Sequence, residues 1–473
     1  MILPYLSGQE GAAYLVVAPL LLLVAVSIVS AYSKSRRFSF AATMALLLAA
    51  GAASLYAAAA GASFIFLHIL QADAFGSLLF GAIAIAMAMV EALSYKHSQC
   101  LQQFNMLLSF VALGAFMVAF AYSIISVLVG IELVILATAF MILQNGKGYV
   151  EPALKLFVLG AVATAVFTLA MALIFPYSQS LTLSAVAALP AGKFIIGMSL
   201  VLFIGALSIE SGAFPFNFWV PDVYEGAPGN ITALLAGVNK KVAIIALMEI
   251  TLVVFAASSI SATTPLFTDT IIIIAVFTMF FGNLAALVQK NIKRLFAYSS
   301  ISQAGYIFIG ISTATHFGAE ASVFYIISHM FMIIGAFAVV FWLETKEIRT
   351  AEEYAGLYGR NAFAAIALTV LMLSMAGIPP LVGFVGKFLL FSSAVYANYA
   401  YLALIGVINS FISIYYYAKL INQMFLRKGD RRLGMDMGIA IVVAACVAFV
   451  ILAGVYPQPL IGAASAAASA LGL

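Results

Sequence analysis

Residues Gly205 to Lys241 read GALSIESGAFPFNFWVPDVYEGAPGNITALLAGVNKK, and this stretch decides the architecture of the chain. It begins as an apolar helix that carries a carboxylate, Glu210, before the segment GAFPF interrupts it with a glycine and a proline. After an acidic segment rich in proline and glycine, a second apolar helix carries two adjacent lysines, Lys240 and Lys241. A broken helix with a carboxylate, next to a helix with buried ammonium groups, predicts an ion path across a membrane.

The composition is that of a polytopic membrane protein. Of the 473 residues, 65% are hydrophobic and only 8% are charged, whereas soluble domains carry roughly 25% charged residues. Two cysteines, Cys100 and Cys446, and four scattered histidines are too few for a metal cluster or a haem. No glycine-rich nucleotide loop follows a strand, so we expect no cofactor and no metal in this chain. The net charge of +4 does not indicate a nucleic-acid partner, because membrane topology places the basic residues.

The hydrophobic runs predict about fourteen membrane-spanning helices. A span needs about 20 apolar residues, and the periodicity is helical throughout, with no alternating strand pattern. The predicted spans lie near residues 11–32, 39–62, 73–95, 104–122, 124–144, 152–176, 193–217, 230–257, 268–288, 294–313, 318–343, 361–395, 397–426 and 436–458.

The lysines and arginines support this count. If the loops after odd-numbered helices lie inside, they hold all but six of the 21 basic residues. By the positive-inside rule, we therefore expect a multi-pass protein of the cell (plasma) membrane with both termini on the outer side. The six exceptions lie within the spans or at their ends, and they are Lys155, Lys193, Lys240, Lys241, Lys387 and Lys419.

Two of the predicted spans are interrupted at matching positions. Helix 7 is broken at GAFPF and helix 12 at the GIPP segment 377–380, and each is the fourth member of a five-helix block. Because five is odd, the second block starts from the opposite side of the membrane. We predict an all-α polytopic fold with two inverted five-helix repeats. Its predicted parts are helices 1–3 (1–103), the first repeat with helices 4–8 (104–257), the second repeat with helices 9–13 (268–426), and the C-terminal helix 14 (436–473).

Several ionisable residues fall inside the predicted spans, where an unpaired charge costs about 3 kcal/mol on insertion scales. Glu132 in helix 5 is either a proton-binding group or a carboxyl that packs helices together. Lys240 and Lys241 point roughly 100° apart, so both cannot face one axis, and one of them is either functional or solvated in an inner vestibule. Lys387 follows the break in helix 12, where unwound backbone makes a buried lysine tolerable.

Two readings stay open for other residues in the spans. Lys155 lies four residues after Glu151, so it either joins the ion path or reaches the inner surface and pairs with Glu151. His329 in helix 11 either relays protons, since its charge changes near neutral pH, or packs as a satisfied core histidine. Trp219 and Trp342 lie at the ends of spans, where we expect them to anchor the protein at the membrane interface.

Four longer strings carry a family resemblance. They are EPALKLFVLGA (151–161), FWVPDVYEGAP (218–228), GNLAALVQKNIKRLFAYSSISQAGY (282–306) and SMAGIPPLVGFVGKF (374–388). They resemble the antiporter-like membrane subunits of respiratory complex I, above all the N-type subunit, which is equivalent to subunit 2 of mitochondrial NADH dehydrogenase. The resemblance implies two half-channels and a chain of protonatable residues along the membrane midplane. It matches Glu132, Lys155, Lys240 and Lys387 to the family's helix-5 glutamate and to its helix-6, helix-8 and helix-12 lysines.

The sequence departs from the family pattern at three positions. The family's helix-7 lysine falls on Glu210, the usual helix-10 histidine is Gln303, and a position that is often histidine after the helix-7 break is Asn217. These departures are compatible with an archaeal or otherwise divergent complex that takes electrons from a donor other than NADH.

The substitution at Glu210 leads to a specific expectation. Helices 5 and 7 face one another in the family, so Glu132 would meet Glu210 instead of a lysine. Two close carboxylates cannot both ionise easily, and the pair would share one proton or recruit Lys155 or Lys240 as a counter-charge. In the alternative arrangement, Glu210 turns away toward the inner vestibule and stays solvated.

The resemblance implies a proton-translocating, antiporter-like subunit of a complex I-type NADH (or other donor):quinone oxidoreductase. Such a subunit has no redox centre of its own and couples electron transfer in partner subunits to ion pumping. Its partners would be other membrane subunits, through them a quinone-reducing peripheral arm, and the lipid bilayer. Two alternatives stay open, a subunit of a multi-subunit sodium/proton antiporter and a scaffold whose pump has decayed. The candidate site residues are Glu132, Lys155, Glu210, Lys240, His329 and Lys387.

Overall fold

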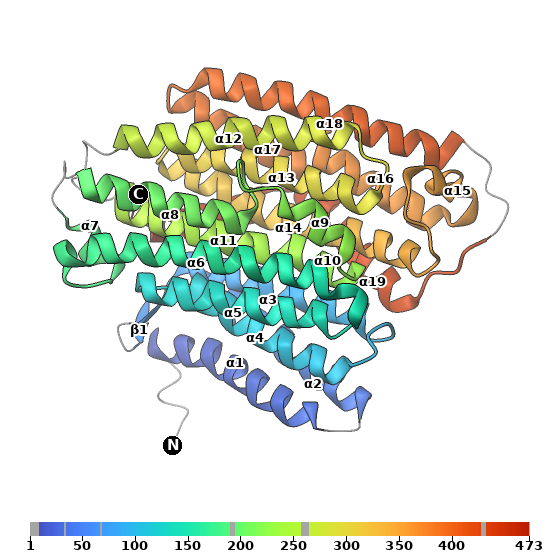
Figure 1. The fold of residues 1–473 in the computed structure, drawn as a ribbon, viewed down its shortest axis with the longest axis horizontal. Coiled ribbons are helices and arrows are strands. Elements are labelled where there is room, and N and C mark those ends of the chain that lie inside the picture. The colour runs from blue at the N-terminus through green and yellow to red at the C-terminus, as the bar shows by residue number, and fades with distance from the viewer. Residues whose placement is uncertain are drawn as a thin grey trace.

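The computed structural model describes residues 9–32, 35–66, 69–189, 194–256, 264–426 and 432–472. Within these ranges the chain forms a bundle of long helices that run side by side along one direction (Figure 1). Eleven of the described helices are long and apolar enough to cross a membrane. A helix satisfies its own backbone groups, which is why such apolar segments adopt this conformation in lipid. The predicted all-α membrane architecture is therefore confirmed.

The first half of the chain follows the predicted spans closely. Its last span is one continuous helix with two π-helical segments, η3 and η4, on either side of α11. The long elements are α1 (Gln9–Ala31), α2 (Arg36–Ala59), α3 (Ala74–Ser94), α4 (Leu101–Ala119), α5 (Ile124–Leu143), α6 (Val150–Ser178), α8 (Phe194–Ser211), α10 (Gly229–Leu234), η3 (Leu235–Asn239), α11 (Lys240–Met248) and η4 (Glu249–Ala256).

The second half shows the same agreement, including the interruption expected in helix 12, which separates α16 from α17. The long elements are α12 (Thr264–Leu287), α13 (Ile292–Ser312), α14 (His316–Glu344), α16 (Ala362–Ala376), α17 (Val382–Tyr396), α18 (Ala400–Leu426) and α19 (Met437–Val455). The grouping of these helices into two inverted repeats, with the boundaries given above, remains a prediction.

Short elements in the connections were not expected. Two short strands, β1 and β2, form an antiparallel hairpin in which Phe64 pairs with Ala72. Strands of three residues are too short to produce a recognisable alternation. The unexpected elements are β1 (Phe64–Phe66), β2 (Leu70–Ala72), η2 (Lys147–Tyr149), α7 (Leu183–Ala187), α9 (Trp219–Gly226), η5 (Ala351–Tyr354), α15 (Leu357–Arg360) and α20 (Gln458–Ala470).

The helix α14 forms the centre of the bundle. Every residue of its apolar window is buried, and the window of the α10–α11 helix is 94% buried, against 33% for α6 and α18. α14 packs against α13, α16, α17, α19 and α20. Ionisable residues on α11 and α14 are therefore kept away from lipid, whereas α6 and α18 cover the outside.

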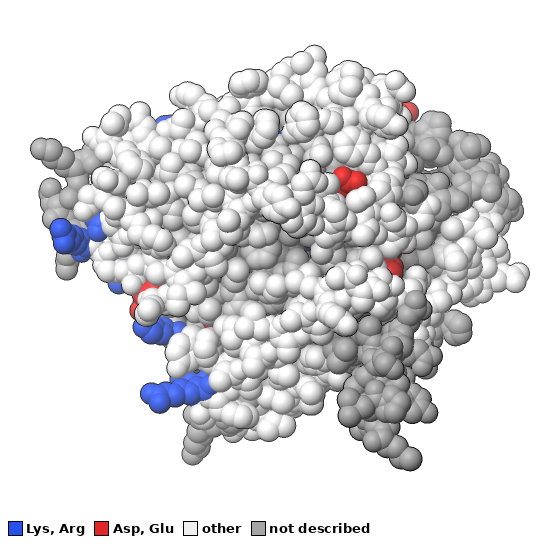
Figure 2. Space-filling model, turned by 180° about the vertical axis from the view of Figure 1, so that it is seen from behind, with Lys and Arg blue, Asp and Glu red and all other residues white. Residues whose placement is uncertain are grey.

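Basic side chains gather at one end of the bundle (Figure 2). Figure 2 shows lysines and arginines gathered along its left edge, which is the right-hand edge in Figure 1, and uncharged residues over the broad middle. We call this edge, where Lys96, Lys147, Lys290 and Arg294 lie near the ends of helices, the basic end. The basic residues Lys34, Lys193, Arg427, Lys428 and Arg431 lie outside the described residues.

A close approach of α4 and α5 yields a stability test. A Cβ atom at Gly114 would lie 2.5 Å from the carbonyl oxygen of Gly130, so the two backbones touch. Gly114→Ala should therefore separate the helices and cost about 1–3 kcal/mol, seen as a lower unfolding temperature in detergent. Gly205→Ala on α8 is the control, because its Cβ would have no neighbour within 4 Å. Equal unfolding temperatures for the two variants would contradict this packing.

Candidate functional site

The interruption of helix 7 leaves a non-helical segment whose backbone groups need hydrogen-bond partners inside the bundle. α8 ends at Ser211, Gly212 adopts a left-handed φ of +64°, and α9 begins only at Trp219. The indole Nε1 of Trp219 donates a 2.9 Å hydrogen bond across the break to the carbonyl of Ile209. Trp219 is only 4% exposed. The expectation that it anchors the protein at the membrane interface is therefore wrong. Its indole instead binds the backbone carbonyl of Ile209 at the break.

Lys240 occupies this break. Its side chain is 1% exposed, and a Cβ atom at Gly212 would lie 3.5 Å from its Nζ. Glycine at this position therefore supplies both the left-handed backbone and the space for the lysine. The Lys240 ammonium also donates a 3.3 Å hydrogen bond to the Ser300 hydroxyl on α13, beside the hydroxyl of Tyr224.

Lys387 is held in the same way at the break of helix 12. α16 ends at Ala376, and Gly377 has a left-handed φ of +90°. The Lys387 Nζ donates to the Ala376 carbonyl at 3.2 Å and to the Ser410 hydroxyl at 2.9 Å. Its ammonium also lies 4.4 Å from the centroid of the Tyr306 ring, a cation–π contact. The break thus provides the acceptors that this buried lysine requires.

Lys241 contributes a contact that the sequence did not predict. Its Nζ lies 2.6 Å from Nδ1 of His329 on α14, and both side chains are buried. Lys240 and Lys241 therefore face different partners, Ser300 and His329, and both partners are buried. This is possible because the α10–α11 helix is surrounded by other helices, so two directions around it lead into the protein.

His329 carries a fully buried imidazole on α14. Lys240, Lys241 and Lys387 all act on it electrostatically, although Lys387 belongs to the second helix break. Its Nε2 is buried and has no hydrogen-bond partner among the described residues. One of the two imidazole nitrogens therefore has no partner within the described ranges, while the other contacts Lys241.

A chain of polar groups continues from His329 toward the second break. The Tyr325 ring stacks on the imidazole with 6.3 Å between centroids, and its hydroxyl donates to Gln303 Oε1 at 2.5 Å. Gln303 Nε2 then donates to the Met375 carbonyl at 3.1 Å, one residue before the carbonyl that binds Lys387. We call the set Lys240, Lys241, His329, Tyr325, Gln303 and Lys387 the polar axis.

A cavity of about 380 Å³ opens onto the second break. Phe384, Phe388 and Phe411 line its wall, and Lys387 and Ser410 form its polar floor. Phe388 and Phe411 are 60% and 68% exposed on the outside of the bundle. The cavity therefore lies between Lys387 and the lateral surface of the protein.

The carboxyl groups of Glu132 and Glu210 belong to α5 and α8. Glu132 is half-buried on α5, and it is the charged group that acts on Glu210 of α8. Oε1 of Glu210 is buried and has no hydrogen-bond partner in the described part of the chain. A cavity of about 20 Å³ joins Glu210 to Asn239, the residue before Lys240, and this volume suits one water molecule.

Among the described residues, no lysine forms an ion pair with either of these carboxyl groups. Within the described ranges, the ion pairs of Lys155 are with Glu151 at 2.8 Å and Asp222 at 3.0 Å. Lys240 faces Ser300 instead. The expected pairing of Lys155 with Glu151 is thus present, but neither lysine contacts Glu132 or Glu210, because each already binds other groups.

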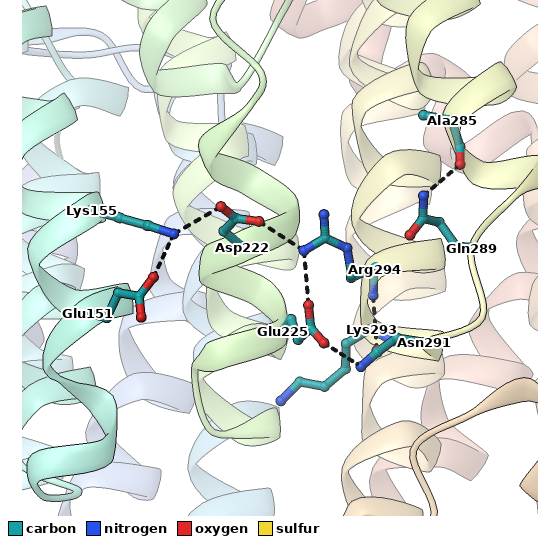
Figure 3. A network of polar contacts seen from close by, with 9 residues as sticks. All are labelled: Glu151, Lys155, Asp222, Glu225, Ala285, Gln289, Asn291, Lys293 and Arg294. Atoms are coloured by element: carbon teal, nitrogen blue, oxygen red, sulfur yellow. Dashed lines mark hydrogen bonds and ion pairs between the residues drawn. The ribbon is translucent and has the colours of Figure 1, made fainter.

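Lys155 belongs to a network at the basic end, shown in Figure 3. Asp222 on α9 binds Lys155 of α6 with one oxygen, and it binds Arg294 of α13 with the other at 2.8 Å. Arg294 also binds Glu225 at 2.9 Å. The network therefore ties the helix after the first break to helices from both halves of the chain.

The charge of Asp222 holds this network together. Burial alone would raise the pKa of Asp222, but hydrogen bonds from Lys155 and Arg294 outweigh it, so the pKa is lowered below its ordinary value. A lowered pKa means that the carboxylate is ionised at neutral pH. The stabilisation is lost only as the pH falls through the lowered value.

The described residues include no group of three or more histidine, cysteine, aspartate or glutamate side chains that could hold a metal ion. Both Cys100 and Cys446 are free thiols. The chemistry that this arrangement supports is proton exchange among amines, an imidazole, a phenol and carboxyl groups.

Comparison with known proteins gives a consistent result. Residues 121–413 match the model of the family described as NADH:quinone oxidoreductase/Mrp antiporter, TM. The chain is 35% identical to NADH-quinone oxidoreductase subunit N of Trichlorobacter lovleyi, covering 74% of this chain and 73% of that protein. It is 32% identical to F(420)H(2) dehydrogenase subunit N of Methanosarcina mazei, covering 86% of each.

A solved structure shares the fold along almost the whole chain. A chain of respiratory complex I from Thermus thermophilus superimposes with a TM-score of 0.83 and 27% identity, covering 95% of this chain and 99% of that one. The resemblance to the N-type subunit is thereby confirmed. This chain belongs to the NADH:quinone oxidoreductase/Mrp antiporter family of membrane proteins.

Proposed function

We propose that this chain is a proton-translocating, antiporter-like subunit of a complex I-type oxidoreductase that transfers electrons to a quinone. The observation that carries the proposal is the polar axis, which links the two helix breaks through buried lysines and a histidine. Intramembrane ionisable residues are costly and mark ion pathways. The relatives named subunit N belong to NADH-quinone and F(420)H(2) dehydrogenases, so the electron donor here is NADH or another reduced carrier.

The polar axis supports proton transfer in both directions. The Lys241 ammonium can give a proton to Nδ1 of His329, since the two nitrogens are 2.6 Å apart. The proton on the other ring nitrogen can then leave toward the Tyr325 hydroxyl through a bridging water. Gln303 orients that hydroxyl and connects it to the backbone that holds Lys387.

Electrostatic repulsion makes the axis responsive to charge. At an effective dielectric of about 20, two cations 4 Å apart repel by about 4 kcal/mol. The groups around His329 therefore cannot all be protonated at once, and a proton that arrives at one favours release from another. A charge change at either helix break would thus be felt along the whole axis.

The first half-channel would hold its proton on the Glu132/Glu210 pair. Their electrostatic interaction supports this proposal, and so does the cavity between Glu210 and Asn239. With no lysine in contact, the pair avoids two adjacent negative charges by sharing one proton. The cavity gives that proton a water-sized step toward Asn239, next to Lys240.

In this proposal the chain is the membrane part of an enzyme and has no redox centre of its own. Its partners are other membrane subunits and, through them, a quinone-reducing peripheral arm. The chain lies in the cell membrane with both termini outside and the basic end inside, as the positive-inside rule requires. The buried and partnered Lys240 and Lys387 favour an active pump over a decayed scaffold.

The first test concerns Lys387. In the purified assembly reconstituted into vesicles, Lys387→Ala should lower proton pumping and coupled turnover together, by about tenfold, because the second break loses its exchangeable proton. Electron transfer to an artificial acceptor upstream should survive. Lys419→Ala on the exposed face of α18 is the matched control and should behave as the wild type. A Lys387→Ala variant that pumps at the wild-type ratio would rule out this role.

The second test concerns the carboxylate pair. Glu210→Gln and Glu132→Gln should impair pumping to similar extents, because each removes one half of a shared proton site. If the two residues form one unit, the double variant should be no worse than either single variant. Proton uptake per electron measures all three. Full pumping by Glu210→Gln would make Glu210 a bystander, and strictly additive losses would separate the two sites.

A further inference from the structure

Glu91 is a buried acid outside both helix breaks. It lies on α3, one helical turn before Tyr95, where the helix ends at the basic end. Its exposed fraction is 0%. α3 also packs against α10 and α14, so this acid lies where the first three helices meet the rest of the bundle.

The Glu91 carboxyl group lacks the partners that an ionised group requires. Neither of its oxygens has a hydrogen-bond partner among the described residues, and no ion pair in those ranges includes it. Among the described residues, the Asn105 side chain on α4 interacts with this carboxyl group, although no hydrogen bond joins the two. The Asn105 amide nitrogen donates to Ser39 of α2 at 3.0 Å, while its carbonyl oxygen is buried without a partner.

A proton on Glu91 removes the buried charge that lacks partners. A fully buried carboxylate with at most one neutral neighbour and no cation is strongly disfavoured. Protonation removes the charge and turns one oxygen into a donor, which can serve the unpartnered Asn105 oxygen. The same proton can be released again, which leaves the carboxylate.

Two polar contacts follow Glu91 along the chain, one at the surface and one toward the helix that carries Lys240. On the side of the basic end, His97 lies 3.2 Å from Asp436 at the surface. Toward the interior, Ser94 lies three residues along the same face of α3, and its hydroxyl accepts a 2.9 Å hydrogen bond from Asn230 of α10. That helix carries Lys240 about 15 Å further on.

We propose that Glu91 is a proton-binding residue of the translocation path, an entry site on the first three helices. A hydronium ion at the basic end gives its proton to the carboxylate and becomes water. The neutral carboxyl group later passes the proton toward α10 and returns to the carboxylate. This inference rests on the proposed pumping function and extends it to a residue outside both half-channels.

The test combines infrared difference spectroscopy with pumping by the purified assembly in vesicles. Besides the band of the Glu132/Glu210 pair, the wild type should show a carbonyl band of a protonated carboxylic acid that shifts in deuterated water, and Glu91→Gln should lack this second band. Glu91→Gln should also lower protons pumped per electron by about twofold or more, and Glu91→Asp should restore part of the loss. Glu352→Gln, at an exposed position of η5, should change neither reading.

The outcomes separate this inference from the proposed function. If the wild type pumps but Glu91→Gln keeps the second band or the wild-type ratio, the role of Glu91 is overturned and the pump stands. If the wild type moves no protons, the proposed function fails first. Should Glu91→Gln not assemble, Glu91→Asp decides, because its shorter carboxyl must shift the acid band, and an unshifted band overturns the proposal.

Discussion

An ammonium group buried in an apolar bundle must find acceptors, and this requirement organises the centre of the protein. A continuous helix offers none, because its carbonyls are already bonded within the helix. The interruptions of helix 7 and helix 12 free backbone and space, and Lys240 and Lys387 fill them. In both cases a glycine with left-handed φ lies against the lysine side chain. The breaks and the lysines therefore depend on one another.

The short helix α9 connects the first helix break to the basic end of the protein. The segment after the first break continues as α9, whose Asp222 and Glu225 bind Arg294 at the basic end. These ion pairs hold α9, the helix that follows the first break, against α13. Exposed ion pairs contribute little stability singly, so we interpret this network chiefly as a positional constraint on α9.

Much of the fold followed from the sequence, because each span is a local property of about 20 residues. The breaks at GAFPF and GIPP, and the depth of Lys240 and Lys387, could be found in the same way. The pairing of Lys241 with His329 could not, because it joins helices 88 residues apart. The short helix α9 was missed, since Pro221 suggested a loop, although proline is tolerated in a first turn. The complete burial of Glu91 could not be predicted either, because the residue lies close in sequence to a charged loop.

The central claim is that protons cross the protein along the polar axis. Substitution of Gln303 tests this claim most directly, because Gln303 does not titrate but contacts both Tyr325 and the backbone beside Lys387. Proton uptake per electron should be measured in vesicles for Gln303→Leu and Gln303→His. The account predicts that leucine lowers the ratio by severing the link from Tyr325 to the Met375 carbonyl. Histidine, which can carry a proton at this position, should preserve the ratio. A Gln303→Leu variant that pumps at the wild-type ratio would contradict the account.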